Sequence, residues 1–176
     1  MDGMSAIIRP ARTEDAAGVA AVQVASWRTT YPGIVPDDYL AGMNVETATQ
    51  RWVANLAAEE ALNFVAEDAS GIFGFVSGGR LREPVGEYDA ELWAIYLLEE
   101  KQGSGVGRRL VQTLADALLA AGYRSMIVWV LQENSAVNFY KRMGAAAVTG
   151  KMIVIGGVVL PDLALGWREL SKIGQG

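Results

Sequence analysis

The sequence predicts an α+β fold in which helices flank one mixed β-sheet. Three features of the chain support this class. Segment 62–80 contains two apolar runs joined by the turn residues Asp68 to Gly71, which is the pattern of a β-hairpin. A strand-then-helix pattern follows at 90–121 and again at 125–144, and a second hairpin pattern closes the chain at 148–166. Helices between strands favour parallel pairing whereas hairpins pair antiparallel, so we expect both orientations in the sheet.

Each expected element has its own local signal. Strands are apolar runs between turn residues, and helices begin near Asp, Asn or glycine and end near glycine. Thr13 to Asp15 offers the start of the first helix, and the loop 31–38, with two prolines, separates it from the second. The expected strands are 7–9, 62–67, 71–80, 90–98, 125–131, 148–155 and 158–166, and the expected helices are 13–28, a segment after Asn44, 106–121 and a short segment after Asn134.

The length and charge of the chain limit the classes of protein to which it can belong. The 176 residues suit a single domain over 1–176, and a net charge of −5 without a visible basic face argues against nucleic-acid binding. The longest uncharged runs, 16–27 and 152–161, are shorter than the roughly 20 residues that span a bilayer. The first residues show no basic region followed by a long apolar core, so we expect a cytoplasmic protein without a membrane segment.

The chain contains neither cysteine nor histidine. The missing cysteine excludes disulfides, thiolate metal sites and an acyl-cysteine intermediate. The missing histidine removes the commonest metal ligand and the commonest general base, so we expect no metal and no Ser-His-Asp chemistry. Acid–base chemistry in this protein must use carboxylates, tyrosine, lysine or water.

Segment 91–110 is the most informative part of the chain. An apolar strand pattern leads into Gly103, Gly105 and Gly107, and helical spacing of apolar residues begins at Val106. Glycines at this spacing let the backbone approach a bulky group, and the start of a helix presents unpaired N–H groups to an anion. The segment therefore predicts a site for a phosphate or pyrophosphate, with an ordinary strand-to-helix turn as the alternative.

Two common phosphate motifs do not fit this chain. The dinucleotide pattern G-x-G-x-x-G requires a glycine where Arg108 stands, and the P-loop candidate at 144–152 has one residue too many and Met152 in place of a hydroxyl. The remaining pattern places Gln102 three residues before Gly105 and adds Gly107, directly after a strand. It resembles the coenzyme A loop of the GNAT superfamily, the acyl-CoA-dependent N-acetyltransferases.

Two further segments resemble the same family, so the resemblance covers nearly the whole chain. Segment 133–144 carries Asn134 and then Phe139 and Tyr140 on a short helix that ends at Met-Gly, like the second signature of the family. Segment 26–36 is similar to the N-terminal helix and loop of many bacterial members. The resemblance implies a mixed, mostly antiparallel sheet whose fourth and fifth strands splay apart to admit the pantetheine arm of coenzyme A.

The resemblance also implies roles for particular residues. Glu91 would be the general base, and Tyr140 would be the general acid that protonates the departing thiolate. The backbone N–H groups of Ile95 and Leu97 would bind the thioester carbonyl and the pantetheine amides. The expected cofactor-binding residues are Ile95, Tyr96, Leu97, Gln102, Gly103, Ser104, Gly105, Val106, Gly107, Arg108 and Asn134.

The residues themselves leave structural alternatives open. Strand alternation puts Glu91 on one face with Trp93, Ile95 and Leu97, and a carboxylate on an apolar face needs an explanation. Glu91 would act as a base there, lie in water at the strand end, or pair with an arginine. The alternative for Tyr140 is a core aromatic residue.

For the acceptor side, the resemblance implies that Trp27 and Tyr31 shape the pocket. Nearby acidic residues would attract a cationic amine, or would simply form a solvated surface. These residues are Asp37, Asp38, Glu46, Glu87 and Asp89.

The sequence thus predicts an N-acetyltransferase that moves an acetyl group from acetyl-CoA to a primary amine by direct attack in a ternary complex. The acceptor would be a small-molecule or peptide amine, and the sequence leaves its identity open. It also leaves the oligomeric state open, a homodimer included. The alternatives are a catalytically weak acyl-CoA-binding or sensor domain and an unrelated nucleotide-binding α/β domain.

Overall fold

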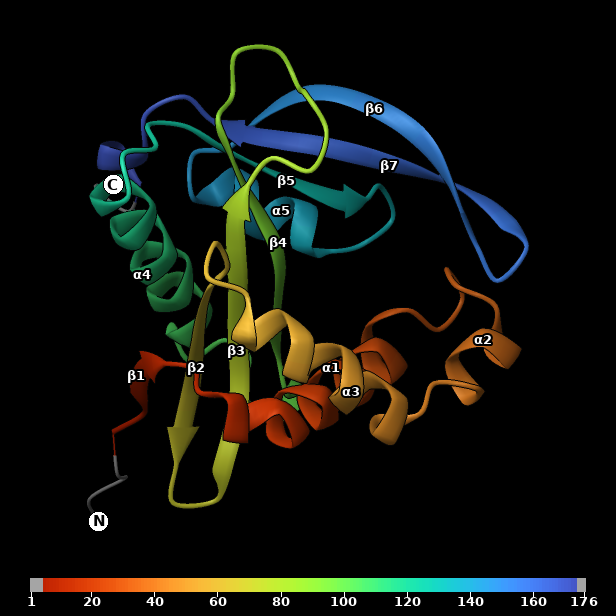
Figure 1. Cartoon of the computed structure of the whole chain (residues 1–176). Coiled ribbons are helices and arrows are strands. Elements are labelled where there is room, and N and C mark those ends of the chain that lie inside the picture. The colour runs from red at the N-terminus through yellow and green to blue at the C-terminus, as the bar shows by residue number, and fades with distance from the viewer. Residues whose placement is uncertain (1–4, 174–176) are drawn as a thin grey trace.

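The computed structural model describes residues 5–173. A sheet of seven strands in the order β1-β2-β3-β4-β5-β7-β6 forms the centre of the molecule, with helices on both faces (Figure 1). The strands are β1 (Ile7–Pro10), β2 (Leu62–Asp68), β3 (Gly71–Arg80), β4 (Ala90–Leu97), β5 (Met126–Leu131), β6 (Ala146–Ile155) and β7 (Val158–Trp167). The α-helices are α1 (Ala16–Thr30), α2 (Asp37–Ala41), α3 (Val45–Ala57), α4 (Val106–Ala120) and α5 (Ala136–Arg142).

The pairing pattern of the sheet confirms the predicted mixed, mostly antiparallel architecture. β4 and β5 pair in parallel, and the other neighbouring strands pair antiparallel. The parallel pair follows from the helix α4 that connects the two strands, because a crossover is needed to return the chain to the same end of the sheet. None of the helices in the described part of the chain is long and apolar enough to span a membrane.

Two apolar cores hold the helices against opposite faces of the sheet. Val65 and Phe75 pack with α1 and α3, whereas the neighbouring residues Ala66 and Val76 pack with α4 and α5. Successive residues of a strand point to opposite faces, so strands β2 and β3 are buried on both sides. This double burial explains why their sequences are almost continuously apolar.

Every predicted strand and helix is present, with ends that differ by a few residues, but the helix α2 was not predicted, and the predicted loop 31–38 covers its first two residues. Pro32 and Pro36 gave this segment the pattern of a loop. The structure shows that the end of α2 is held by a distant side chain. Arg28 of α1 donates a hydrogen bond of 3.1 Å to the carbonyl of Leu40 and one of 2.7 Å to that of Met43. Such a tertiary contact leaves no signal in the local sequence.

A bulge in β4 overturns one prediction about its faces. Gly78 of β3 pairs with Leu92, but the preceding residue Ser77 pairs with Ala94, so Trp93 is an extra residue. Beyond the bulge the alternation is inverted. Leu92, Ile95 and Leu97 therefore all contact the core that contains α4. The prediction that Glu91 shares a face with Ile95 and Leu97 is wrong, because Glu91 lies on the opposite face from Leu92.

The strands β4 and β5 separate shortly after they begin. Their pairing joins Ala90 to Met126, Glu91 to Ile127 and Leu92 to Val128. Beyond these positions both strands continue, to Leu97 and to Leu131, and they diverge. This confirms the predicted splaying of the fourth and fifth strands, and it opens the sheet at its centre.

Candidate active site

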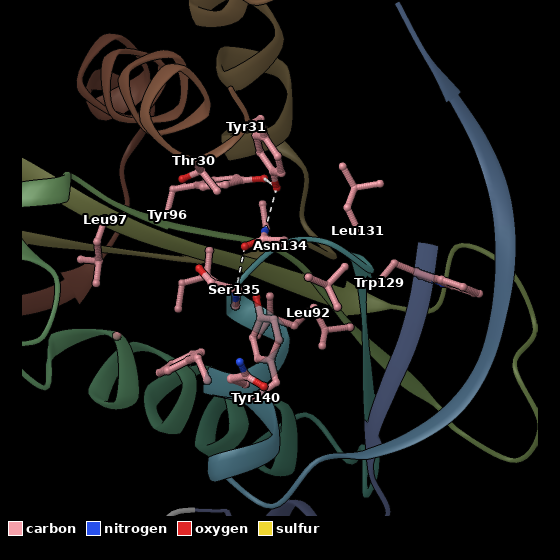
Figure 2. Close-up of a pocket in the computed structure, with 18 of the residues that line it drawn as sticks. Thr30, Tyr31, Leu92, Tyr96, Leu97, Trp129, Leu131, Asn134, Ser135 and Tyr140 are labelled. Carbon is pink, nitrogen blue, oxygen red and sulfur yellow. Dashed lines mark hydrogen bonds between the residues drawn. The ribbon is translucent and has the colours of Figure 1, made fainter. Parts of the chain in front are cut away.

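A cavity of about 850 Å³ occupies the gap between the diverging strands β4 and β5. Figure 2 shows its lining, with Tyr31 and Tyr96 on one side, Tyr140 on the other and Asn134 between them. The cavity brings together twelve of the residues predicted from the sequence: Trp27, Tyr31, Ile95, Tyr96, Leu97, Gln102, Gly103, Gly105, Gly107, Arg108, Asn134 and Tyr140. Ser104, Val106 and Glu91 are not part of this lining.

One end of the cavity is the glycine loop that leads into α4. Gly103 and Gly105 have φ values of +74° and +83°, in the left-handed region where a side chain would be strained. Gly105 is the N-cap of α4, so the first N–H groups of the helix have no partner within it. A methyl group on Gly107 would lie 3.3 Å from Leu97 and 3.5 Å from Phe139, so glycine permits close packing there.

Side chains fix this loop to the end of β4. The Gln102 amide donates to the carbonyl of Leu97 over 3.2 Å, and the Ser104 hydroxyl donates to the carbonyl of Lys101 over 2.7 Å. Lys101 in turn forms an ion pair of 2.6 Å with Asp68 of β2. The loop is therefore anchored at both the strand and the neighbouring hairpin, and it presents its backbone in a defined position.

The backbone of β4 offers a second set of donors. The N–H of Leu98 donates to the carbonyl of Phe73 in β3 over 2.9 Å. Hydrogen-bonding groups alternate along an antiparallel strand, so those of Leu97 and Ile95 point away from β3. They face the side from which β5 has diverged, where the cavity lies. The cavity wall thus carries the N–H groups of two successive outward-facing residues.

Asn134 links the short helix α5 to the other side of the cavity. Its side-chain oxygen accepts from the N–H of Ala136 over 2.9 Å, but the N-cap of α5 is Ser135, one residue later than the expected cap at Asn134. Its side-chain nitrogen donates to the Tyr31 hydroxyl over 3.2 Å, and that hydroxyl lies 3.3 Å from the Tyr96 hydroxyl. Burial raises the pKa of both tyrosines above the ordinary value of 10, so both stay neutral.

Tyr140 projects from α5 and is almost completely buried. Its ring packs edge-on against Phe139, at 5.3 Å between centroids, and against Trp167, at 6.0 Å. Burial raises the pKa of its phenol well above the ordinary value of 10, and the nearby Tyr31 adds a smaller effect in the same direction. The hydroxyl therefore stays protonated at neutral pH and is able to donate a proton or a hydrogen bond.

Glu91 is buried and paired with an arginine, which was one of the alternatives left open by the sequence. Only 1% of its surface is exposed. Arg82 donates to it from its side chain, through Nε over 2.8 Å and through Nη2, and from its backbone N–H over 3.2 Å. Glu91 lines a smaller cavity of about 210 Å³, which shares Arg82, Trp129, Ile153 and Asp162 with the larger one.

Asp162 of β7 is a buried carboxylate that the sequence reasoning missed. It lines both cavities and is only 7% exposed. Burial raises its pKa to about 6, Lys151 and Arg82 act in the opposite direction, and Glu91 reinforces the rise. Its signal in the sequence was a single charge within the apolar run 158–166. The same signal had singled out Glu91.

The acidic residues predicted near the acceptor do not line either cavity. They are Asp37, Asp38, Glu46, Glu87 and Asp89. Asp89 has a structural role, because its carboxylate accepts hydrogen bonds from the backbone N–H groups of Arg124 and Ser125. Within residues 5–173, no three acidic side chains come close enough to hold a metal ion.

Comparisons with known proteins agree with this geometry. Residues 23–145 match the family model described as Acetyltransferase (GNAT) family. The chain is 41% identical over 167 residues to the Bacillus subtilis (strain 168) protein named Uncharacterized N-acetyltransferase YuaI, over 94% of this chain and 95% of that protein. It is 28% identical over 162 residues to an L-methionine sulfoximine/L-methionine sulfone acetyltransferase of Pseudomonas aeruginosa, over 87% of each.

Solved structures share the fold. A GCN5-related N-acetyltransferase of Rhodopseudomonas palustris superposes with a TM-score of 0.74 at 23% identity, over 96% of this chain and 99% of that one. A PaiA N-acetyltransferase of Thermoplasma acidophilum, solved in complex with coenzyme A, superposes with a TM-score of 0.70 at 21% identity, over 94% and 99%. At these identities the similarity establishes the architecture alone.

Proposed function

The chain belongs to the GNAT acetyltransferase family and is an acyltransferase, and we propose that it transfers an acetyl group from acetyl-CoA to a primary amine. The observation that carries this proposal is the cavity between β4 and β5. It joins the glycine loop at the start of α4, a row of backbone donors and a buried phenol in one continuous space. The coenzyme A bound to the Thermoplasma acidophilum protein of the same fold supports this choice of co-substrate.

The glycine loop fits the phosphate groups of coenzyme A. The N–H groups of the first turn of α4, which have no partner within the helix, and the helix dipole favour an anion, and Arg108 adds a positive charge to the lining. Further along, the N–H groups of Ile95 and Leu97 would hold the pantetheine arm and the thioester carbonyl. A donor directed at that carbonyl stabilises the oxyanion that forms when the amine attacks.

Acetyl-CoA supplies a thioester as the acetyl donor, and the residues of the chain provide the proton transfers. Because the sequence contains no cysteine, we propose direct attack by the amine rather than an acyl-cysteine intermediate. Tyr140 would donate to the departing thiolate. A thiol has a pKa of about 8.5, so its thiolate is a good leaving group. Tyr140, whose phenol pKa is raised, need therefore only donate a hydrogen bond to the thiolate, or a proton after the carbon–sulfur bond has largely broken.

The acceptor amine must lose a proton before or during attack, because an alkyl ammonium has a pKa of about 10.4. We propose Glu91 as the group that removes this proton. Since Glu91 is held by Arg82 and lines the smaller cavity, the proton would reach it through water in the space shared by the two cavities. Trp27 and Tyr31, whose ring centroids lie 4.5 Å apart, would shape the end of the cavity that binds the acceptor.

A small-molecule amine is the acceptor class that we favour. The Pseudomonas aeruginosa relative is named for two small amino-acid derivatives, and that name supports a small acceptor. Release of free thiol from acetyl-CoA, measured against a panel of amines, tests the proposed function. Release that depends on an added amine is expected. Binding of acetyl-CoA without any amine-dependent release would instead favour an acyl-CoA-binding domain.

Replacing Gly105 with glutamate should abolish acetyl-CoA binding, because the side chain adds bulk and negative charge to the proposed phosphate site. Calorimetry measures the affinity. Gly71→Glu is the matched control, since Gly71 also has a positive φ of 109° and lies in the β2–β3 turn. The control should bind acetyl-CoA normally. Wild-type affinity in Gly105→Glu would remove the loop from the cofactor site.

Tyr140→Phe keeps the ring and removes the hydroxyl. General-acid contributions are typically about 10²–10⁴-fold, and the good leaving group places the expected loss of turnover near 10²-fold. Acetyl-CoA affinity should hardly change, because the ring contacts remain. Tyr123→Phe, outside the cavity lining, should retain wild-type turnover. If Tyr140→Phe turns over as fast as wild type, Tyr140 is a core residue and nothing more.

Glu91→Gln keeps the shape of the side chain but cannot accept a proton. Transfer should slow most near neutral pH and recover partly at alkaline pH, where more of the amine is already neutral. A pH–rate profile of the variant and the wild type, on an amine found in the panel, measures this difference. Overlapping profiles would show that Glu91 is not the base.

A further inference from the structure

We propose that Asp162 binds the ammonium group of the acceptor and thereby selects amines that are cations at neutral pH. This inference rests on the proposed transfer to an amine and identifies the residue that recognises it. Three observations support it: the face of the sheet on which Asp162 lies, the pairing of the charges around it, and its own lack of a partner.

Strand register places Asp162 on the same face of the sheet as Glu91. Ile127 of β5 pairs with Glu91 on one side and with Gly166 of β7 on the other. Asp162 is four residues before Gly166, an even number, so it points to the same face. Both carboxylates line the smaller cavity, and Asp162 also lines the larger one. Asp162 therefore lies where the two spaces join.

The other charges around this junction are already paired. Arg82 binds Glu91, and Lys151 of β6 forms an ion pair of 3.2 Å with Glu83. Lys151 also lies over the ring of Trp129, 4.2 Å from its centroid. Two cations and two carboxylates thus neutralise each other, and the carboxylate of Asp162 gives the junction a net negative charge.

The side chain of Asp162 forms no hydrogen bond or ion pair in the part of the chain that the structure describes, although Lys151 of β6 lies opposite it in the strand register. The residue is nevertheless only 7% exposed. A buried carboxylate without a partner is costly, and a bound cation removes this cost. An anionic ligand would gain little, because Arg82 and Lys151 are already bound to carboxylates. A cationic amine fits the site.

The test uses n-butylammonium as the probe and 1-butanol as its uncharged analogue, titrated into the full chain and followed by amide NMR shifts in β7. We expect butylammonium to bind and butanol not to bind. Asp162→Asn should weaken butylammonium binding by about tenfold or more, since hydrogen bonds to charged groups are among the strongest. Asp116→Asn makes the same chemical change on the exposed side of α4 and should leave binding unchanged.

A second measurement separates this effect from misfolding. The pKa of Asp162 in the folded protein, about 6, is above the ordinary 3.8, so its charge opposes folding. The wild type should lose stability relative to Asp162→Asn as the pH rises from about 4 to 6, and the variant should be at least as stable at pH 7. Arg82, Lys151, Glu91 and Tyr31 surround this carboxyl and remain in the variant.

Equal butylammonium binding by wild type and Asp162→Asn would overturn the inference, and so would equal binding of butanol and butylammonium. A variant less stable than wild type at pH 7 would also overturn it, because the carboxylate would then have a structural partner. Acetyl-CoA affinity, measured in the same samples by calorimetry, reports on the proposed function separately. Loss of ammonium binding with normal acetyl-CoA affinity assigns the defect to the acceptor site.

Discussion

The separation of β4 from β5 is the constraint on which the rest of the site depends. The two strands pair over Ala90 to Leu92 and then diverge, so an inner strand of the sheet acquires a free edge. Unpaired backbone donors inside a protein are costly unless a ligand or water binds them. The cavity gives the N–H groups of Ile95 and Leu97 access to such a ligand. In the proposed complex, an extended chain with amide groups, such as pantetheine, would satisfy them as a neighbouring strand does.

Packing on both faces keeps the gap open. The core around α1 and α3 supports β4 from one face through Ala94 and Tyr96, and the core around α4 and α5 supports it from the other. Across the gap, hydrogen bonds from Asn134 to Tyr31 and between Tyr31 and Tyr96 connect the loop before α5, the C-cap of α1 and β4. Because these polar groups are buried and paired, they hold the walls at a fixed separation before any ligand binds.

Local patterns in the sequence predicted the parts of the site that depend on local geometry. The glycine loop was predicted because glycines at alternate positions between a strand and a helix leave the backbone accessible to a ligand. Asn134 was predicted from its position just before the short helix, although Ser135 is the N-cap. The bulge at Trp93 was not predicted, since it arises from the pairing of β4 with β3. Asp162 was missed for a similar reason. Only the register of β5 and β7 brings it to the face of Glu91, which lies 71 positions earlier in the numbering.

Amide hydrogen exchange at Ile95 and Leu97 tests the central claim most directly. Without ligand, both amides should exchange much faster than that of Tyr96, which points toward β3 and its partner Phe75. Saturation with coenzyme A should slow exchange at Ile95 and Leu97 and leave Tyr96 unchanged. Exchange at Ile95 and Leu97 that stays fast while calorimetry shows coenzyme A bound would contradict the account, because the ligand would then lie outside the gap between the strands.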